Sequence, residues 1–219
     1  MIKAVLFDLD GTLVNSLDDL ATSANSALET KGYPTHETEK YKYFVGHGMK
    51  NLMERVLPEN HRSEDEILEL LEIFLAHYSK HFADKTRPYE GIIPLLGALR
   101  QKNIKLGVVT NKADHMAQII IKSLLGGYFD YILGKRDEFP AKPDPAATLY
   151  AMKQLDVLPN ECIFIGDSGM DAKNGVNCGA VPVGALWGFR EKAELLENGA
   201  QYTVNAPLEL LDIIEELNA

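Results

Sequence analysis

The chain has 219 residues, 46% hydrophobic and 25% charged, which is the composition of a soluble globular protein with one domain and at most a small accessory unit. Its formal net charge is −10 and it carries no basic run, so we expect no nucleic-acid partner. No apolar run approaches the roughly 20 residues of a membrane helix, the N-terminus is too short and too soon acidic for a signal peptide, and only Cys162 and Cys178 are present. We therefore expect a cytoplasmic protein without membrane contact, whose two cysteines are buried small hydrophobes.

The chain begins with an apolar run over residues 3–7, which predicts a buried strand that ends at Asp8. About 95 residues separate it from the next run of strand character, too many for a single crossover helix. Helical patterns fill most of this interval, at residues 17–31, 49–57 and 64–82. We predict that residues 15–86 form an inserted all-α helical-bundle cap subdomain, and that residues 1–14 and 87–219 form the core domain.

Strand and helix patterns alternate through the rest of the chain. Nearly continuous apolar runs at residues 104–109, 131–133 and 162–165 predict strands buried on both faces of a parallel sheet. Helical patterns lie between and around them, at residues 92–102, 114–125, 145–155, 170–177 and 208–217. This alternation predicts an α/β fold, a Rossmann-like open parallel sheet flanked by helices. Ligands of such sheets bind beyond the carboxyl ends of the strands, so we expect the functional site there.

Two carboxylates follow the first predicted strand. Asp8 and Asp10 point to one side of an extended chain, and Gly11 after them permits a tight turn whose backbone N–H groups can receive an anionic oxygen. Two carboxylates this close repel each other unless a cation or a proton lies between them. The pair is therefore a candidate metal site and a candidate nucleophile with its acid, although the same residues also suit a polar turn.

Two further strand ends and loops carry polar residues of interest. Thr110 ends the second strand and its hydroxyl can donate to a phosphoryl oxygen, although Thr110 and Asn111 also suit the start of the next helix. Lys142 lies in a loop stiffened by Pro143 and Pro145, so its ammonium can be fixed beside carboxylates and neutralise a transferring phosphoryl group. An exposed surface lysine is the alternative for Lys142.

A second acidic pair follows the strand at residues 162–165. Asp167 comes just after that strand, and Asp171 lies four residues on, on one face of the first turn of a helix. Asp171 is also favourable there simply because it is near a helix N-terminus. The oxygen donors of Asp8, Asp10 and Asp167 suit Mg²⁺ better than zinc, because no set of Cys or His ligands accompanies them.

Taken in order, these elements resemble the motifs of the haloacid dehalogenase-like hydrolase superfamily, in its helical-cap subgroup. The resemblance covers essentially the whole chain, and it is closest to phosphoglycolate phosphatase-like members, which usually carry Asp where Asn15 stands. It rests on Phe7-Asp8-Leu9-Asp10-Gly11-Thr12, Thr110-Asn111-Lys112, Lys142-Pro143-Asp144-Pro145 and Gly166-Asp167-Ser168.

The resemblance implies a Mg²⁺-dependent phosphatase that forms an aspartyl-phosphate on Asp8. Asp10 would be the general acid and base and would offer its backbone carbonyl to the metal. Thr110 and Lys142 would bind the phosphoryl group, with Asn111 and Gly11 beside them. Asp167 would complete the metal site, with Asp171 in or next to the coordination shell.

The resemblance also points to a glycine-flanked loop in the inserted subdomain. Relatives place such a loop over the substrate, and here it reads Gly46-His47-Gly48-Met49-Lys50. Glycines let a backbone approach a ligand closely, so Lys50 or His47 can contact a substrate anion. The alternative is a turn between two helices with both side chains in solvent.

Three functions remain open from the sequence. The first is a hydrolase of a small phosphorylated metabolite, such as 2-phosphoglycolate, or of pyrophosphate, a sugar phosphate or a nucleotide. The second is a phosphomutase like β-phosphoglucomutase, and the third is a non-enzymatic binding protein on the same fold. A monomer or a small homo-oligomer is expected in each case.

Overall fold

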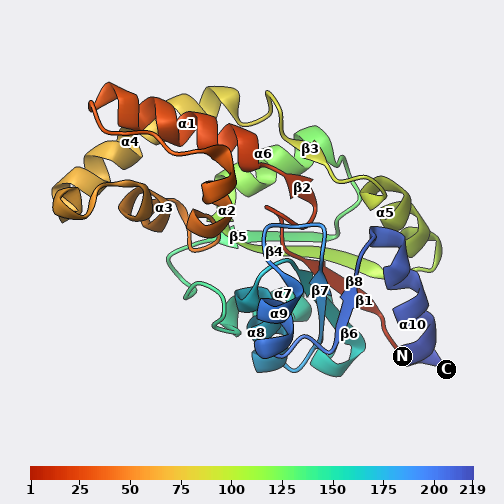
Figure 1. Cartoon of the computed structure of the whole chain (residues 1–219). Helices are drawn as coiled ribbons and strands as arrows, with labels where there is room; N and C mark the ends of the chain where they lie inside the picture. Colours follow the sequence, from red (N-terminus) through yellow and green to blue (C-terminus); the bar gives the residue numbers. More distant parts are fainter. The chain divides into compact units, whose positions relative to one another are not determined.

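The computed structural model describes all residues, 1–219, and divides into two compact units (Figure 1). One consists of Met1–Val14 and Pro88–Ala219 and is called here the sheet unit; the other is Asn15–Arg87, the helical unit. A short two-stranded pairing of β2 (Val14–Asn15) and β3 (Arg87–Pro88) is formed where the chain passes between the units. None of the helices has the length and apolar character that crossing a membrane requires.

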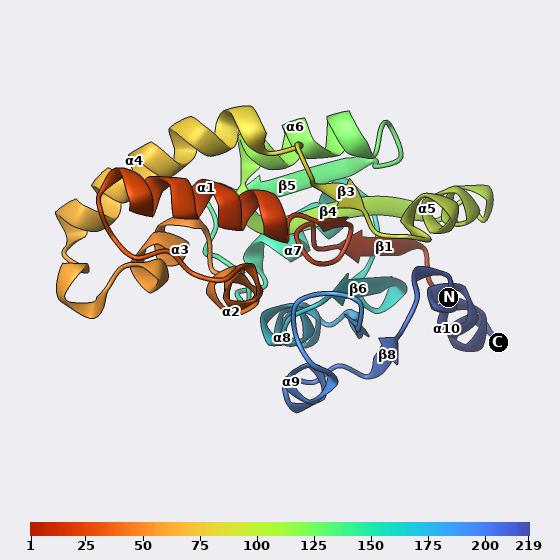
Figure 2. The same cartoon turned by 45° about the horizontal axis from the view of Figure 1, so that its top comes forward.

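The sheet unit contains a six-stranded sheet in the order β5-β4-β1-β6-β7-β8, with every adjacent pair parallel. Figure 2 shows β1 between β4 and β6, where Phe7 is paired with Val108 on one side and Ile165 on the other. Its strands are β1 Ala4–Phe7, β4 Lys105–Ala113, β5 Tyr131–Lys135, β6 Cys162–Gly166, β7 Val181–Ala185 and β8 Tyr202–Val204. The predicted α/β open parallel sheet is confirmed.

Apolar burial on both faces explains why the central strands form. All four side chains of β1 are fully buried, as are nearly all of those in β6. Helix α5 packs on β4, α7 on β4 and β5, and α8 on β6 and β7. The helices of this unit are α5 Ile92–Gln101, α6 Asp114–Leu124, α7 Ala146–Gln154, α8 Gly169–Cys178, α9 Lys192–Glu197 and α10 Leu210–Asn218. The two termini lie side by side, where the Ile2 N–H donates to Asn218 Oδ1 at 2.6 Å (Figure 1).

The observed strands differ from the prediction at β4, β5, β7 and β8, and β5 ends at Lys135 rather than at residue 133. Strand β4 continues to Ala113, beyond the predicted end at residue 109, with an irregular register against β5 between Val109 and Ala113. This extension was not predicted, because it contains the polar residues Thr110, Asn111 and Lys112. Strands β7 and β8 were not predicted, because β7 contains Pro182 and β8 has only three residues.

The helical unit contains α1 Leu17–Thr30, α2 Tyr41–Phe44, α3 Met49–Val56 and α4 Glu64–His81. Helices α1 and α4 pack along each other, with α3 beside α4. The predicted apolar stripe of α4 is largely buried, at Ile67, Leu70, Phe74 and Tyr78. Ser16 is the N-cap residue of α1 as expected, but its side chain makes no capping hydrogen bond; Asn15 Oδ1 accepts the Leu17 N–H instead, at 3.3 Å.

Both cysteines are buried in the core against the sheet, as predicted, and neither forms a disulfide. Burial raises the pKa of Cys162 to about 12 and also raises the pKa of Cys178. Neither thiol is therefore a reactive nucleophile at neutral pH.

Candidate active site

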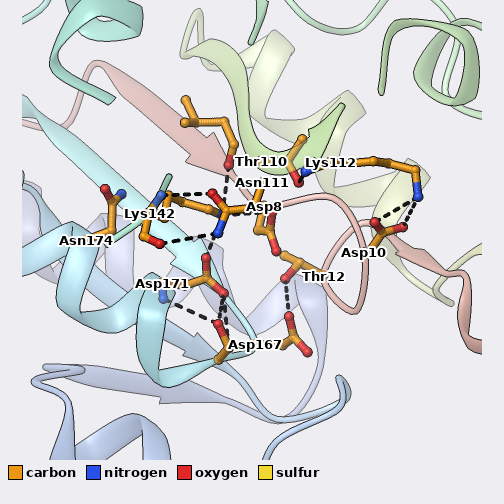
Figure 3. A network of polar contacts seen from close by, with 12 residues as sticks. Asp8, Asp10, Thr12, Thr110, Asn111, Lys112, Lys142, Asp167, Asp171 and Asn174 are labelled. Carbon is orange, nitrogen blue, oxygen red and sulfur yellow. Dashed lines mark hydrogen bonds and ion pairs between the residues drawn. The ribbon is translucent and has the colours of Figure 1, made fainter. Parts of the chain in front are cut away.

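Asp8 follows β1 directly and stands at the carboxyl edge of the sheet. Its backbone N–H donates to Ile165 O at 3.0 Å, which extends the β1–β6 ladder by one residue and fixes where the side chain starts. The Asp8 side chain is 14% exposed, and its Oδ1 lies 2.8 Å from Lys142 Nζ (Figure 3). Asp8 is thus a partly accessible carboxylate on a rigid element, paired with an ammonium.

Lys142 is buried and its ammonium is held by three oxygens. Nζ lies 2.8 Å from Asp8 Oδ1 and 2.7 Å from Asp171 Oδ1, and donates to Val109 O at 3.0 Å. The peptide bond to Pro143 is cis. Burial lowers the pKa of the ammonium, but the attraction of Asp171 and Asp8 outweighs it, so the net pKa is raised and Lys142 stays charged.

Asn111 holds the backbone of Lys142 in place. Its Oδ1 accepts the Lys142 N–H at 2.8 Å and its Nδ2 donates to Lys142 O at 3.3 Å, both within the buried interior. This double contact ties the Lys142 loop to β4. The side chain of Asn111 therefore supports Lys142, and a contact between Asn111 and a substrate stays a prediction.

Asp167 and Asp171 come from the segment that follows β6. The oxygens of Asp167 accept the Thr12 hydroxyl at 3.2 Å and the Phe189 N–H at 2.7 Å, and the residue is 2% exposed. Asp171 Oδ2 accepts the Ser168 hydroxyl at 2.5 Å and the Ser168 N–H at 3.1 Å, in a capping box at the start of α8. Both predicted roles of Asp171, as a helix-terminal residue and as part of the acidic cluster, are thus compatible with its position.

Two glycines make room for Asp167. A Cβ at Gly11, where φ is +87°, would lie 2.3 Å from Asp167 Oδ2. A Cβ at Gly188 would lie 2.2 Å from Asp167 Cβ and 2.4 Å from Gly11 O. Gly11 also forms the predicted turn, although its N–H donates to Val14 O at 2.9 Å. A contact between Gly11 and a substrate stays a prediction.

Asp8, Asp167 and Asp171 form one acidic cluster, in which ligand oxygens of the three residues lie within 4.8 Å of one another. Burial, opposed by Lys142 and reinforced by Asp171, raises the pKa of Asp8 to about 6. Burial and the charges of Asp171 and Asp8 raise the pKa of Asp167 to about 8. One ammonium is too little positive charge for two buried carboxylates and a third that is only partly exposed, so the cluster favours a proton or a cation. A hard divalent cation with oxygen ligands fits this donor set.

The Asp10 carboxylate is outside this cluster. It forms a two-oxygen ion pair with Lys112, whose Nζ lies 2.9 Å from Oδ2 and 3.1 Å from Oδ1. Figure 3 shows this pair on one side of the site, with Asp8, Lys142, Asp167 and Asp171 gathered on the other. Sequence reasoning expected Asp10 to serve the metal through its backbone carbonyl, and this also stays a prediction.

Thr110 and Lys50 complete the predicted residues. Thr110 is 6% exposed and its Oγ1 accepts the Lys112 N–H at 3.3 Å. Lys50 is in the helical unit, where its exposed ammonium lies 2.5 Å from Glu64 Oε1. A phosphoryl contact of Thr110 and a substrate contact of Lys50 remain predictions.

The sequence did not predict three supporting contacts. The Thr12 hydroxyl and the Phe189 N–H donate to Asp167, and Lys112 forms an ion pair with Asp10. Their partners are far away in the sequence, and no local spacing indicates the contacts. Trp187 is half-buried and donates from Nε1 to Thr12 O at 2.9 Å, which helps to fix the loop after β1.

Comparison with known proteins places these residues in a family. The model of the haloacid dehalogenase-like hydrolases matches residues 5–185. A phosphoglycolate phosphatase of Chromobacterium violaceum is 36% identical over 98% of this chain and 97% of its own length, and one of Aquifex aeolicus is 31% identical with the same coverage.

Solved structures agree with the sequence comparison. A candidate phosphoglycolate phosphatase of Lactobacillus delbrueckii subsp. bulgaricus has a TM-score of 0.91 at 32% identity, covering 97% of this chain and 98% of its own. A β-phosphoglucomutase of Clostridium difficile has a TM-score of 0.81 at 23% identity, covering 100% and 98%, and shares the fold. The chain therefore belongs to the haloacid dehalogenase-like hydrolase family, within its phosphoglycolate phosphatase-like phosphatases.

Proposed function

We propose that this chain is a Mg²⁺-dependent phosphatase that hydrolyses a small phosphomonoester, with 2-phosphoglycolate as the leading candidate, through an aspartyl-phosphate on Asp8. The observation that carries the proposal is the position of Asp8: a carboxylate at the carboxyl edge of a parallel sheet, 2.8 Å from a buried ammonium and grouped with two more carboxylates. Two phosphoglycolate phosphatases that match nearly the whole chain support this choice of substrate.

The metal would be held by Asp8, Asp167 and the Asp10 backbone carbonyl, with Asp171 in or next to its shell. When bound, Mg²⁺ supplies positive charge that draws the phosphate and Asp8 together. Asp171 already receives hydrogen bonds at both oxygens, from Lys142 and Ser168, so we assign it mainly to orienting Lys142.

The proposed reaction has two steps. In the first, Asp10 leaves Lys112 and takes up a proton from solvent, an Asp8 oxygen attacks phosphorus, and the bond from phosphorus to the ester oxygen breaks. Asp10 gives its proton to the departing alkoxide. In the second, water attacks phosphorus, Asp10 takes the water proton, and orthophosphate leaves while the Asp8 carboxylate is restored. Lys142 and Thr110 bind the phosphoryl oxygens in both steps.

A panel of phosphate esters assayed with Mg²⁺ tests this proposal, with released orthophosphate as the readout. We expect turnover of small phosphomonoesters by the native protein and none by Asp8→Asn, which keeps the side-chain volume but removes the nucleophile. Circular dichroism and thermal unfolding of Asp8→Asn control for its fold. Turnover by a folded Asp8→Asn variant would contradict the covalent mechanism.

A further inference from the structure

Lys112 and Lys142 are the two lysines that the fold buries, each 5% exposed. Lys142 is engaged by Asp8, Asp171 and Val109 O, and thus belongs to the phosphoryl site. Lys112 contacts no substrate group in the mechanism above. A lysine is rarely buried without a paired anion, so the anion that Lys112 binds indicates what kind of group this lysine can recognise.

The anion on Lys112 is the carboxylate of Asp10. Both Asp10 oxygens lie within hydrogen-bond distance of Lys112 Nζ, at 2.9 and 3.1 Å. The Lys112 side chain is 2% exposed and the Asp10 side chain 14%. Lys112 lies near the end of β4, two residues after Thr110, in the stretch whose register against β5 is irregular. The site therefore contains a buried carboxylate receptor that is filled by one of the protein's own side chains.

The proposed acid step requires this ion pair to break. Asp10 must turn from Lys112 towards the ester oxygen, and removing one partner from a buried ion pair leaves a buried charge uncompensated, which is strongly unfavourable. A second carboxylate that takes the place of Asp10 removes this penalty. Asp10 can reach only as far as its own side chain rotates, so the proposed acid step places the ester oxygen near Lys112.

We propose that Lys112 recognises a carboxylate on the leaving group of the substrate, and that this carboxylate displaces Asp10 from Lys112 and so releases Asp10 to reach the ester oxygen. In 2-phosphoglycolate a single methylene separates the ester oxygen from such a carboxylate. Lys112 thus acts as a specificity residue and as a switch for the acid. The inference rests on the proposed phosphatase function and adds to it a preference for an anionic leaving group.

The test compares two esters of equal length, 2-phosphoglycolate and 2-hydroxyethyl phosphate, which carries a neutral hydroxymethyl group in place of the carboxylate. For the native protein we expect a kcat/KM ratio of at least roughly 10 to 100 in favour of 2-phosphoglycolate, the scale of one buried charged contact. A native protein that hydrolyses both esters equally well overturns the inference without touching the phosphatase function. A native protein that hydrolyses neither contradicts the phosphatase function itself, and the inference falls with it.

Lys112→Met keeps the length of the side chain and removes its charge, and we expect it to collapse this ratio towards one. Lys112→Arg keeps the charge and is expected to retain a preference for 2-phosphoglycolate. Lys122→Met, at an exposed lysine on α6, is the matched control. If Lys112→Met lowers both kcat/KM values equally, Lys112 only supports the fold and the inference is wrong.

A binding measurement covers the case in which Lys112→Met folds poorly. In the Asp8→Asn background turnover stops, so calorimetry can compare the affinities for the two esters directly. We expect tighter binding of 2-phosphoglycolate, and loss of that difference in Asp8→Asn/Asp10→Asn/Lys112→Met, where neither charge of the pair remains. Equal affinities for both esters in the Asp8→Asn protein overturn the inference.

Discussion

The charge around Asp8 is set by three carboxylates and one ammonium. Asp8, Asp167 and Asp171 share the cation of Lys142, and all four groups are largely withdrawn from water. Burial is the main cause of the raised pKa values, about 6 for Asp8 and about 8 for Asp167, and the neighbouring carboxylates raise both further. A metal ion at this position would replace protons that the folded protein otherwise retains.

Mg²⁺ binding is therefore expected to depend on pH. An acid with a raised pKa holds its proton in the folded state above the pH at which the unfolded chain loses it, so the metal-free protein loses stability as pH rises from about 4 to about 8. Mg²⁺ requires the ionised forms, so its affinity and its stabilising effect should increase with pH between about 6 and 8. Thermal unfolding at fixed Mg²⁺, measured across this window, checks the prediction.

Asp167→Asn is the control for that measurement, because it removes one of the titrating carboxylates at nearly constant volume. The Mg²⁺-induced rise in Tm should be smaller in this variant and should vary less with pH. A native protein whose Mg²⁺ shift is independent of pH, or larger at acid pH, would argue against a metal on this cluster.

The residues that sequence reasoning found and missed differ in one physical respect. Asp8 and Asp167 directly follow strands, so a strand pattern was enough to locate them. Lys112 and Asp10 are 102 positions apart, and a lysine after Thr110-Asn111 looks the same whether it is exposed or buried against an acid. The direction in which Asp10 points depends on that contact and could not be predicted from the sequence.

At the scale of elements, the buried carboxylate of Asp19 connects the first turn of α1 to the segment before β3 by hydrogen bonds. Asp19, in the first turn of α1, is 3% exposed and accepts hydrogen bonds from the Lys85 N–H, the Thr86 N–H and the Thr86 hydroxyl. These donors come just before β3. The carboxylate thus joins the start of α1 to the last segment of the same unit.

Asp19→Ala should destabilise the protein by about 3 kcal/mol, because it leaves buried backbone N–H groups without an acceptor. The neighbouring Asp18 is exposed, so Asp18→Ala removes the same charge from the same helical turn and should change the free energy of unfolding by less than about 0.5 kcal/mol. Urea unfolding of both variants measures the difference. Equal effects of the two substitutions would show that the hydrogen bonds of Asp19 do not stabilise this end of the unit.

The elements that could be predicted are those formed by a continuous run of apolar residues, because such a run indicates a buried strand. Strands β1 and β6 meet this condition and were located to within a residue or so. Strand β7 lies inside the sheet yet contains Pro182, and the β4 extension carries three polar residues, so local preference and tertiary position disagree there. Tertiary pairing in the sheet prevails at both places.

At the scale of the whole molecule, the site depends on the parallel topology. Because every strand runs the same way, the segments after β1 and β6 and the end of β4 meet at one edge, although residues 8, 110, 142 and 167 are far apart in the chain. The order of these motifs was enough to predict the family, which the match over residues 5–185 bears out. That the helical unit acts as a cap over this edge remains a prediction.

The account depends most on the transfer of the phosphoryl group to Asp8, and acid quenching of a single turnover with Mg²⁺ tests this directly. Acyl phosphates survive acid long enough for peptide mass spectrometry, which should find one phosphoryl group on the peptide that carries Asp8, in the native protein but not in Asp8→Asn. A phosphoryl group on another residue, or orthophosphate formed in the first turnover with no phosphorylated protein at any quench time, would contradict the account.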